Sequence, residues 1–376
     1  MLGSLDGGAP VQLTLGYSSV AYASGFLLFV RSGTLLAMPF DDAKGRITGD
    51  PVSVAERVQY HPGVGTALFS VSTEGTLVVN EEGQRGVGWV DRSGRPLGLV
   101  ATGILDGVGR LSRDGMRLAA AVTDPGPGAA DIYVIDVASG ATKRLTTDPK
   151  WDQSPVWSPD GRSVIFRSNR ELKNPLWMRG IDGGESERRL IVGADGSDLL
   201  PTDWSPDGRV VLVERSPPGG SRDLVSLAMP AGDRLEPWLA TPFNEREARF
   251  SPDSRWVAYQ SDESGADEIY IRAFSTPGPS QRVTAKGGTF PVWGRDGRAL
   301  YFFDADGMMV SVPVTLGAAV TKGAPHILFD ARPLGERRNF EVDDAGRFLM
   351  NYVNPGPEAS RAEIVLNWLQ LVQPKK

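Results

Sequence analysis

Charged and amide side chains stand just before several short apolar segments of this 376-residue sequence, and they are the groups with which it could do chemistry. Both charge signs occur among them, so together they suit a cation or a polar, charged ligand. The candidate binding residues are Asp152, Asp203, Asn244, Glu245, Arg246, Glu247, Arg249 and Arg338. Four of them, Asp152, Asp203, Glu245 and Glu247, are also candidate metal ligands, since Ca²⁺ takes about six to eight oxygen ligands. A solvated rim of ion pairs is the simpler interpretation of the same carboxylates.

Other catalytic chemistry has few residues to work with. The sequence contains no cysteine, which excludes a disulfide, a thiolate nucleophile and a Cys-ligated zinc ion. Only two histidines are present, His61 and His326, and they are weak candidates for a general base. Each is more simply interpreted as a loop or edge-strand residue. A serine hydrolase is disfavoured because no Gly-x-Ser-x-Gly motif occurs.

Charge and hydrophobicity limit the kinds of partner that this chain could bind. Lys and Arg total 40 and Asp and Glu total 46, so the formal charge is −6, which argues against general nucleic-acid binding. The longest apolar stretches, residues 20–30 and 364–372, are shorter than the roughly 18 residues that a membrane helix needs. We therefore expect no membrane insertion by this chain, and we expect a monomer. The first residues also lack the basic segment and apolar core of a signal peptide.

A repeated turn motif indicates which elements must position the candidate residues. Its clearest copy is Trp157-Ser158-Pro159-Asp160-Gly161-Arg162. Further copies, some of them weak, lie at residues 24–25, 72–75, 111–115, 204–209, 250–255, 293–298 and 342–347. Successive turns are 40 to 50 residues apart, with a period near 46. This period is typical of propeller blades with four strands each, and the repeated turns account for the 45 Gly and 28 Pro.

The sequence within one repeat predicts four strands and no helix. Residues 154–158 form an inner strand, and Asp160-Gly161 is a hairpin turn signal because Gly accepts a positive φ. Residues 163–166, 176–178 and 189–191 are the next three strands. Nowhere does a window of 12 or more residues show a convincing helical period. The whole chain is therefore predicted to be all-β.

Counting inner strands predicts a propeller of eight blades, with seven as the alternative, in a single domain over residues 1–376. The last blade would contain residues 340–342, 348–352 and 364–369. An N-terminal strand at residues 11–15 would complete it, close the ring and remove an exposed edge. Residues 2–5 then remain as a strand without a blade, which would fit a chain cut from a longer parent.

The recurring aspartates and tryptophans are interpreted as structural. Each aspartate is expected to bond the backbone of its own turn, and each tryptophan to pack between neighbouring blades, with an aromatic sugar-binding platform as the alternative. They are Asp114, Asp160, Asp207, Asp253 and Asp296, and Trp157, Trp204 and Trp293. Function is expected instead in the loops that precede the inner strands, because these loops gather at one mouth of the central channel.

At these repeats the chain resembles the TolB-like propellers, whose motif reads W-S-P-D-G-[RK]. It is most similar to the propellers that follow bacterial eukaryotic-type serine/threonine protein kinases. The segments that carry this resemblance include residues 25–30, 90–94, 241–246 and 261–265. The resemblance implies an extracytoplasmic or periplasmic sensor domain. Kinase activity is not carried over, because the sequence has no His-Arg-Asp, Asp-Phe-Gly or Lys-bearing strand signature.

Two functions fit these observations. The first is a non-catalytic sensor or binding module for a protein, peptide or glycan, which needs no catalytic group. The alternative is a calcium-dependent hydrolase of esters, lactones or phosphotriesters with its site at the channel mouth. In that alternative, His61 or His326 would act as the base.

Overall fold

The computed structural model describes residues 18–31, 33–56, 58, 60–61, 66–80, 84–102, 109–123, 130–171, 173–183, 186–276, 278–334, 339–354 and 362–372. Internal contacts divide the chain into two compact units. The first unit comprises Met1–Gln84 with Val353–Lys376, and the second comprises Arg85–Tyr352. Within the described ranges, no helix is both long enough and apolar enough to cross a bilayer.

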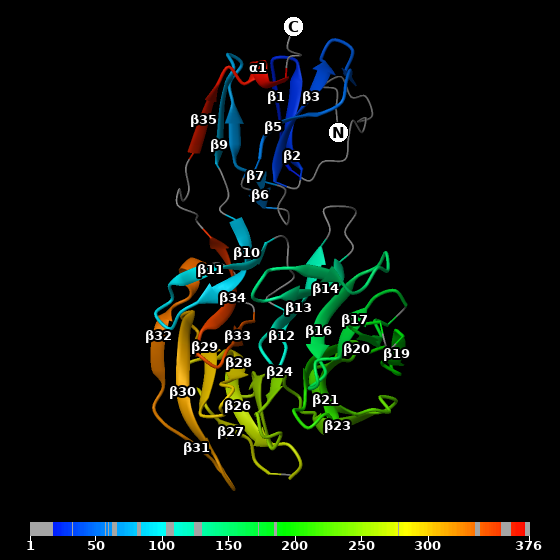
Figure 1. Cartoon of the computed structure of the whole chain (residues 1–376), viewed down its shortest axis with the longest axis vertical. Coiled ribbons are helices and arrows are strands. Elements are labelled where there is room, and N and C mark those ends of the chain that lie inside the picture. The colour runs from blue at the N-terminus through cyan, green and yellow to red at the C-terminus, as the bar shows by residue number, and fades with distance from the viewer. Residues whose placement is uncertain are drawn as a thin grey trace. The chain divides into compact units, whose positions relative to one another are not determined.

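The first unit contains two antiparallel sheets and a short pair of strands (Figure 1). Its elements are β1 (Val20–Ala23), β2 (Phe26–Arg31), β3 (Thr34–Asp41), β4 (Arg46–Ile47), β5 (Val52–Ala55), β6 (Tyr60–His61), β7 (Thr66–Ala67), β8 (Phe69–Val71), β9 (Thr76–Asn80), β35 (Ala362–Leu366) and α1 (Leu369–Val372). One sheet has the order β1-β2-β3-β4, with β5 also paired to β3. The other has the order β35-β9-β8, so a strand near the C-terminus pairs with one from the N-terminal part.

A shared core joins these two sheets. Leu28 and Leu35 from one sheet, Leu77 and Val79 from the other, and Trp368 before α1 belong to one cluster of buried side chains. Trp368 has no exposed surface. Apolar side chains from both sheets thus meet in one core between them.

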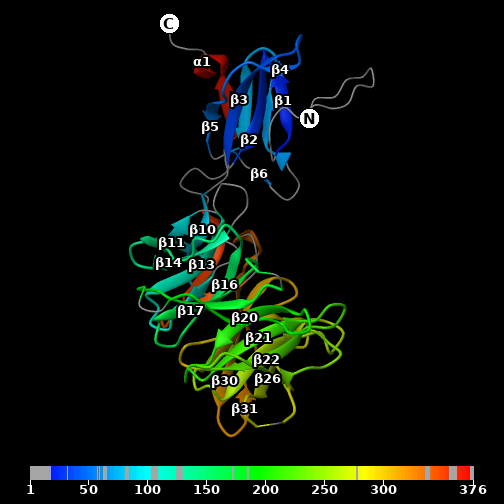
Figure 2. The same cartoon turned by 90° about the vertical axis from the view of Figure 1, so that its right-hand side faces the viewer.

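The second unit consists of six antiparallel sheets of four or five strands each (Figures 1 and 2). Three of them contain β12 (Arg110–Leu111), β13 (Arg117–Thr123), β14 (Ala130–Asp136) and β15 (Thr142–Arg144); β16 (Asp152–Trp157), β17 (Ser163–Ser168), β18 (Leu176–Gly180) and β19 (Arg188–Ile191); and β20 (Asp198–Trp204), β21 (Val210–Ser216), β22 (Asp223–Ala228) and β23 (Leu235–Leu239). The next two contain β24 (Glu245–Phe250), β25 (Trp256–Ser261), β26 (Glu268–Ala273) and β27 (Gln281–Arg282); and β28 (Thr289–Trp293), β29 (Ala299–Phe303), β30 (Met308–Leu316), β31 (Val320–Lys322) and β32 (His326–Asp330). A 3₁₀ turn, η1 (Arg332–Leu334), leads to the sixth sheet, which has the order β11 (Pro96–Thr102), β10 (Gln84–Val90), β34 (Phe348–Asn354) and β33 (Glu341–Val342).

The repeated motif builds the hairpin between the first two strands of a blade, as predicted. At the clearest copy, the Ser158 hydroxyl donates to Asp160 at 2.6 Å, and Asp160 accepts the backbone N–H of Arg162 at 3.0 Å. Gly161 has φ +67°, a conformation that residues with a side chain adopt rarely. The same serine–aspartate bond recurs in the hairpins of Asp207 and Asp253. These aspartates are therefore structural.

Hydrophobic contacts close the six sheets into a ring. Each buried cluster of the second unit contains side chains from two adjacent sheets: Phe166 and Trp157 pack with Ile132, for example. Equivalent clusters occupy the next junctions around the ring. The last junction joins Leu349 of the sixth sheet to Leu118 of the sheet that begins with β12. The second unit is therefore a propeller with six blades.

The predicted count of eight blades, and seven as its alternative, is wrong for these residues. The turns near residues 25 and 75 lie in the first unit, where the strands pair in a different order. The expected closure also differs, because β10 and β11 complete the last blade while residues 362–366 pair with β9. Residues 2–5 and 11–15, expected to be strands, lie outside the described residues. Turn signals mark where a hairpin bends, but they do not encode which distant strand pairs with it.

Candidate functional site

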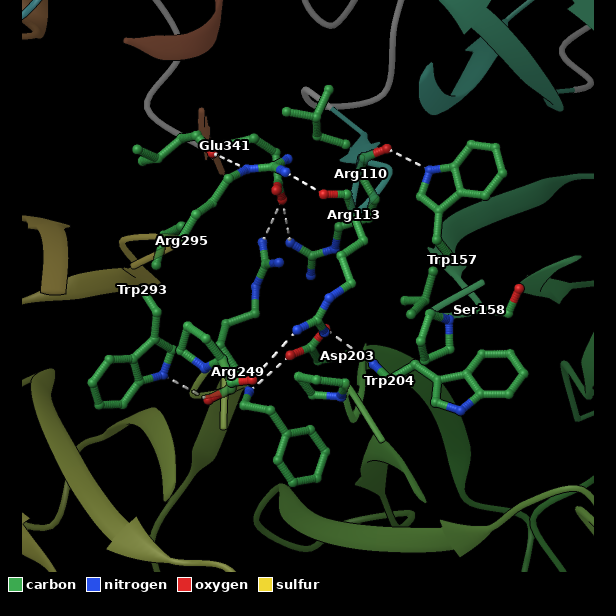
Figure 3. Close-up of a pocket in the computed structure, with 18 of the residues that line it drawn as sticks. Arg110, Arg113, Trp157, Ser158, Asp203, Trp204, Arg249, Trp293, Arg295 and Glu341 are labelled. Atoms are coloured by element: carbon green, nitrogen blue, oxygen red, sulfur yellow. Dashed lines mark hydrogen bonds and ion pairs between the residues drawn. The ribbon is translucent and has the colours of Figure 1, made fainter. Parts of the chain in front are cut away.

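The six inner strands, β12, β16, β20, β24, β28 and β33, surround a cavity of about 290 Å³, which we call the hub cavity (Figure 3). It lies at the C-terminal ends of these strands, and every blade contributes to its wall. Its charged lining residues are Arg110, Arg113, Arg249, Arg295, Asp203, Glu341 and Asp344, and its aromatic ones are Trp157, Trp204, Phe250 and Trp293. The cavity thus combines four guanidinium groups, three carboxyl groups and aromatic surface.

A buried carboxylate joins two of these arginines at the centre of the ring. Glu341 Oε1 lies 2.9 Å from Arg249 Nη2 and 3.3 Å from Arg110 Nη1, and Figure 3 shows both side chains converging on it. Arg110 also donates to the carbonyl of Thr202 at 2.8 Å. Burial raises the pKa of Glu341 to about 7, against the opposing charges of Arg110 and Arg295. Three inner strands are therefore tied together by one charged network.

Asp203 connects the blade of β20 to that of β24. Its carboxylate accepts the backbone N–H of Trp204 at 3.0 Å and that of Phe250, in the next blade, at 2.7 Å. The Asp203 side chain lines the hub cavity, and the surrounding blades shield it from bulk solvent. Burial therefore raises the pKa of Asp203 to about 7, although the charge of Arg110 acts in the opposite direction.

Two tryptophans of the repeat fasten adjacent inner strands. Trp157 Nε1 donates to the carbonyl of Arg110 at 2.8 Å, and Trp293 Nε1 donates to that of Arg249 at 3.0 Å. Both rings are 6% exposed. Each indole thus packs between neighbouring blades, as expected from the sequence, and its hydrogen bond fixes the backbone of an arginine that lines the hub cavity. Trp204 differs, since its indole donates to its own hairpin at Gly208.

A smaller cavity of about 90 Å³ lies toward the N-terminal ends of the inner strands, where Glu247 and Arg110 are among its lining residues. Here the pairing of several inner strands is irregular, and Ser154, Glu247 and Phe290 adopt positive φ values of 52° to 56°. Such bulges redirect side chains. The backbone N–H of Glu247 donates to the buried carboxyl group of Glu214 at 2.7 Å. Burial and the nearby Glu247 charge raise the pKa of Glu214 to about 8.

The remaining acidic candidates from the sequence are engaged inside individual blades. Asp152, at the start of β16, is fully buried and accepts two hydrogen bonds from Arg170 Nη2 at 2.9 and 3.0 Å. Burial raises the pKa of Asp152, while its hydroxyl and Arg170 partners act against this change. Asp152 is not among the residues that line either channel cavity. It belongs to a network with Arg170 and Glu187.

Three consecutive candidates, Asn244, Glu245 and Arg246, lie at the start of β24 and also make local contacts. Asn244 bonds Asp262 through its backbone N–H at 2.8 Å and its side-chain amide at 2.7 Å. Arg246 pairs with Asp267. Glu245 accepts the hydroxyl of Thr241, in the connection between β23 and β24, and burial raises the pKa of Glu245 to about 7. Asn244 and Arg246 thus bond the connection between β25 and β26, whereas Arg249 and Glu247 line the channel cavities.

The histidines and the metal candidates are not brought together. His326 is exposed at the start of β32, a strand on the outer edge of its blade. The side chain of His61, in the first unit, and the whole of Arg338 lie outside the described residues. Of the proposed calcium ligands, Asp203 and Glu247 line different cavities, while Asp152 and Glu245 line neither. Among described residues, no group of three or more His, Asp or Glu side chains is arranged to hold a metal ion.

Comparison with known proteins agrees with the architecture. Residues 103–229 match the family model described as the TolB beta propeller domain. The structure of TolB from Acinetobacter baumannii superposes with a TM-score of 0.51 at 16% identity, covering 66% of this chain and 65% of that one. The second unit therefore has a β-propeller fold like that of TolB. A TolB candidate from Agrobacterium tumefaciens gives a TM-score of 0.55 at 19% identity over 73% of this chain and 99% of that one.

Curated relatives of the TolB-like propeller match over short segments. The Tol-Pal system protein TolB of Bordetella pertussis is 36% identical over 58 residues, or 15% of this chain and 13% of that protein. An uncharacterized protein of Agrobacterium fabrum is 38% identical over 83 residues, or 22% of this chain and 28% of that protein. The matched parts thus span less than a third of these relatives.

In the TolB-like propeller, the larger of the two channel cavities lies at the end of the inner strands opposite to the one expected. Arg113 and Arg295 follow inner strands, so they lie outside the loops in which functional residues were expected. Both lie in divergent copies of the turn motif, at the position that is Pro159 in the clearest copy. That replacement of proline by arginine was a usable signal, because a turn does not require a charged side chain at this position.

Proposed function

We propose that the TolB-like propeller is a non-catalytic binding module that holds a segment of a protein or peptide partner in the hub cavity. The observation that carries this proposal is the convergence of all six blades on one cavity with guanidinium, carboxyl and indole groups in its wall. Binding sites generally pair apolar and aromatic surface with a few placed polar groups. Aromatic and arginine side chains are also the types enriched where proteins bind one another.

The engagement of the carboxylates supports a binding role over the hydrolase alternative. Asp203 accepts two backbone N–H groups and Glu341 accepts two guanidinium groups, so both act as ties between blades. A rigid wall of this kind suits recognition, since little conformational entropy is lost when a ligand binds. Together with the resemblance to kinase-attached propellers, this supports a role as an extracytoplasmic sensor domain, which we include in the proposal.

A blocked cavity tests the proposal. Pro206 lines the hub cavity and is half-buried, so Pro206→Trp would fill part of it, while Pro218→Trp changes an exposed loop between β21 and β22. Peptides would be selected from a random 12-residue display library on the wild-type chain and their dissociation constants measured. We expect at least tenfold weaker binding to Pro206→Trp and unchanged binding to Pro218→Trp. Equal affinities for the two variants, or no selected peptide at all, would refute a binding site in the hub cavity.

A further inference from the structure

The third position of the turn motif forms a ring around the opening of the hub cavity. In each blade this residue is the second one after the end of the inner strand. In all six blades it lines the cavity. We call these six residues the rim: Arg113, Pro159, Pro206, Pro252, Arg295 and Asp344. The rim is therefore the part of the cavity that a ligand meets first.

The rim is divided into two chemically different halves. Three consecutive blades, those of β16, β20 and β24, contribute the half-buried Pro159, Pro206 and Pro252. The other three, which are consecutive around the closed ring, contribute Arg295, Asp344 and Arg113. One half is apolar and the other carries two positive charges and one negative charge.

The two rim arginines differ from the arginines deeper in the cavity in the groups they bond. Arg249 shares Glu341 with a second arginine, so its charge is compensated. Arg295 donates to the carbonyls of Val342 and Ser112, each at 3.0 Å, and to the carbonyl of Arg113. Arg113 reaches across the rim to the carbonyl of Pro252 at 3.4 Å. Neither Arg113 nor Arg295 has a carboxylate within 4.0 Å among the described residues.

These partners leave the rim arginines able to bind a carboxylate. A hydrogen bond between two charged groups is roughly twice as strong as one between neutral groups, and a guanidinium can hold a carboxylate through two parallel bonds. The 3.4 Å bond of Arg113 is beyond the usual range for N–H···O, so a ligand displaces little by breaking it. Arg295 donates to the backbone of Arg113, which places both arginines in one sector of the rim.

We propose that the rim recognises an acidic peptide segment, with an Asp or Glu carboxylate on Arg113 and Arg295 and neighbouring apolar side chains on the three prolines. This inference rests on the proposed binding role of the hub cavity and specifies its ligand. A peptide, rather than a free small acid, fits because the charged half covers only one side of the opening. A peptide can also place apolar side chains against the three prolines, whereas a small free acid has no group to do so.

The test compares substitutions that remove charge at matched positions. Arg113→Gln removes a rim guanidinium whose side chain is exposed, so the fold is retained. Arg162→Gln is the control, because Arg162 is an exposed arginine in an equivalent hairpin and does not line the cavity. The probes are peptides selected from the random 12-residue library on the wild-type chain, the same peptides with Gln in place of Asp and Glu, and free glutarate. Affinities are measured by isothermal titration calorimetry at two salt concentrations, with melting temperatures of all variants.

The expected result is enrichment of Asp and Glu beside apolar residues in the selected peptides. Arg113→Gln should weaken their binding about tenfold, as should the Gln peptides, and added salt should weaken it further. Arg162→Gln should leave it unchanged.

Three other results would overturn the inference. Peptides without acidic residues that are sensitive to Pro206→Trp but not to Arg113→Gln would leave the binding role standing and remove the acidic ligand. Glutarate binding as tightly as the peptides, through the same arginine, would assign the rim to small acids. Peptides insensitive to both substitutions would overturn the proposed function as well.

Discussion

Replacing Asp203 by Asn isolates the contribution of one buried carboxylate to the stability of the ring. The carboxylate offers one oxygen to Trp204 and the other to Phe250, in adjacent blades. An Asn side chain keeps one acceptor oxygen and turns an amide N–H₂ toward the other backbone N–H. A buried donor left without an acceptor costs about 1–3 kcal/mol. At about 2–4 °C per kcal/mol for a domain near this size, we expect the melting temperature to fall by about 5 °C.

The same substitution also changes the pH dependence of stability. The pKa of Asp203 rises from 3.8 to about 7 on folding, mainly because of burial, so the folded state binds this proton more tightly. Its contribution to stability is complete below pH 3.8 and is lost as the pH rises through 7. Between pH 6 and pH 8 this amounts to about 1.4 kcal/mol. Asp203→Asn removes that contribution, so it should destabilise the protein more at pH 6 than at pH 8.

Denaturant and thermal unfolding at pH 6, 7 and 8 measure both effects. Asp233→Asn is the matched control, because Asp233 is an exposed carboxylate in the turn before β23. That control should match the wild type in melting temperature and in pH dependence. If Asp203→Asn melts at the same temperature as the wild type, the tie between the two blades is refuted. If the stability of the variant also changes between pH 6 and pH 8 as much as that of the wild type, the raised pKa of Asp203 is refuted.

Three further substitutions test other parts of the structure. Glu341→Ala leaves two nearly buried guanidinium groups without their carboxylate and should lower the free energy of unfolding by about 3–5 kcal/mol in urea titrations; a loss below about 1 kcal/mol would contradict the network. Gly109→Ala should destabilise by at least about 2 kcal/mol more than Gly183→Ala in the same assay. Both glycines have positive φ, but a Cβ at Gly109 would lie 2.3 Å from the carbonyl of Ala119, whereas that at Gly183 meets open space. Trp368→Ala should destabilise the first unit by about 3–5 kcal/mol, and an unchanged calorimetric profile would argue against its core position.

Local features of the fold were readable because each depends on neighbouring residues. The hydrogen bonds of Ser158, Asp160 and Gly161 all lie within one hairpin, so the motif predicts the turn wherever it occurs. The four-stranded blade followed from the same spacing. The number of blades did not, because the turns near residues 25 and 75 look like those of the propeller and yet belong to a different unit.

Only some of the candidate site residues could be placed correctly from the sequence. Arg249, Asp203 and Glu247 were predicted to face the channel, and they do so because inner strands project side chains into it. Asp152 and Glu245 stand at similar places in the sequence, but both are held within blades. The difference between reaching the channel and remaining within a blade comes from bulges in the inner strands, which the sequence does not mark reliably.

The sequence by itself determined that this protein is all-β, that it repeats a hairpin with a period near 46 residues, and that its recurring aspartates serve turns. These features follow from interactions between residues close in the chain. Only the tertiary structure decided that six blades form the ring and that Glu341 lies between two arginines from distant blades. It also decided that the third position of the motif surrounds one cavity with a proline half and a charged half. Closing a ring brings together residues far apart in sequence, and no local pattern specifies which of them will meet.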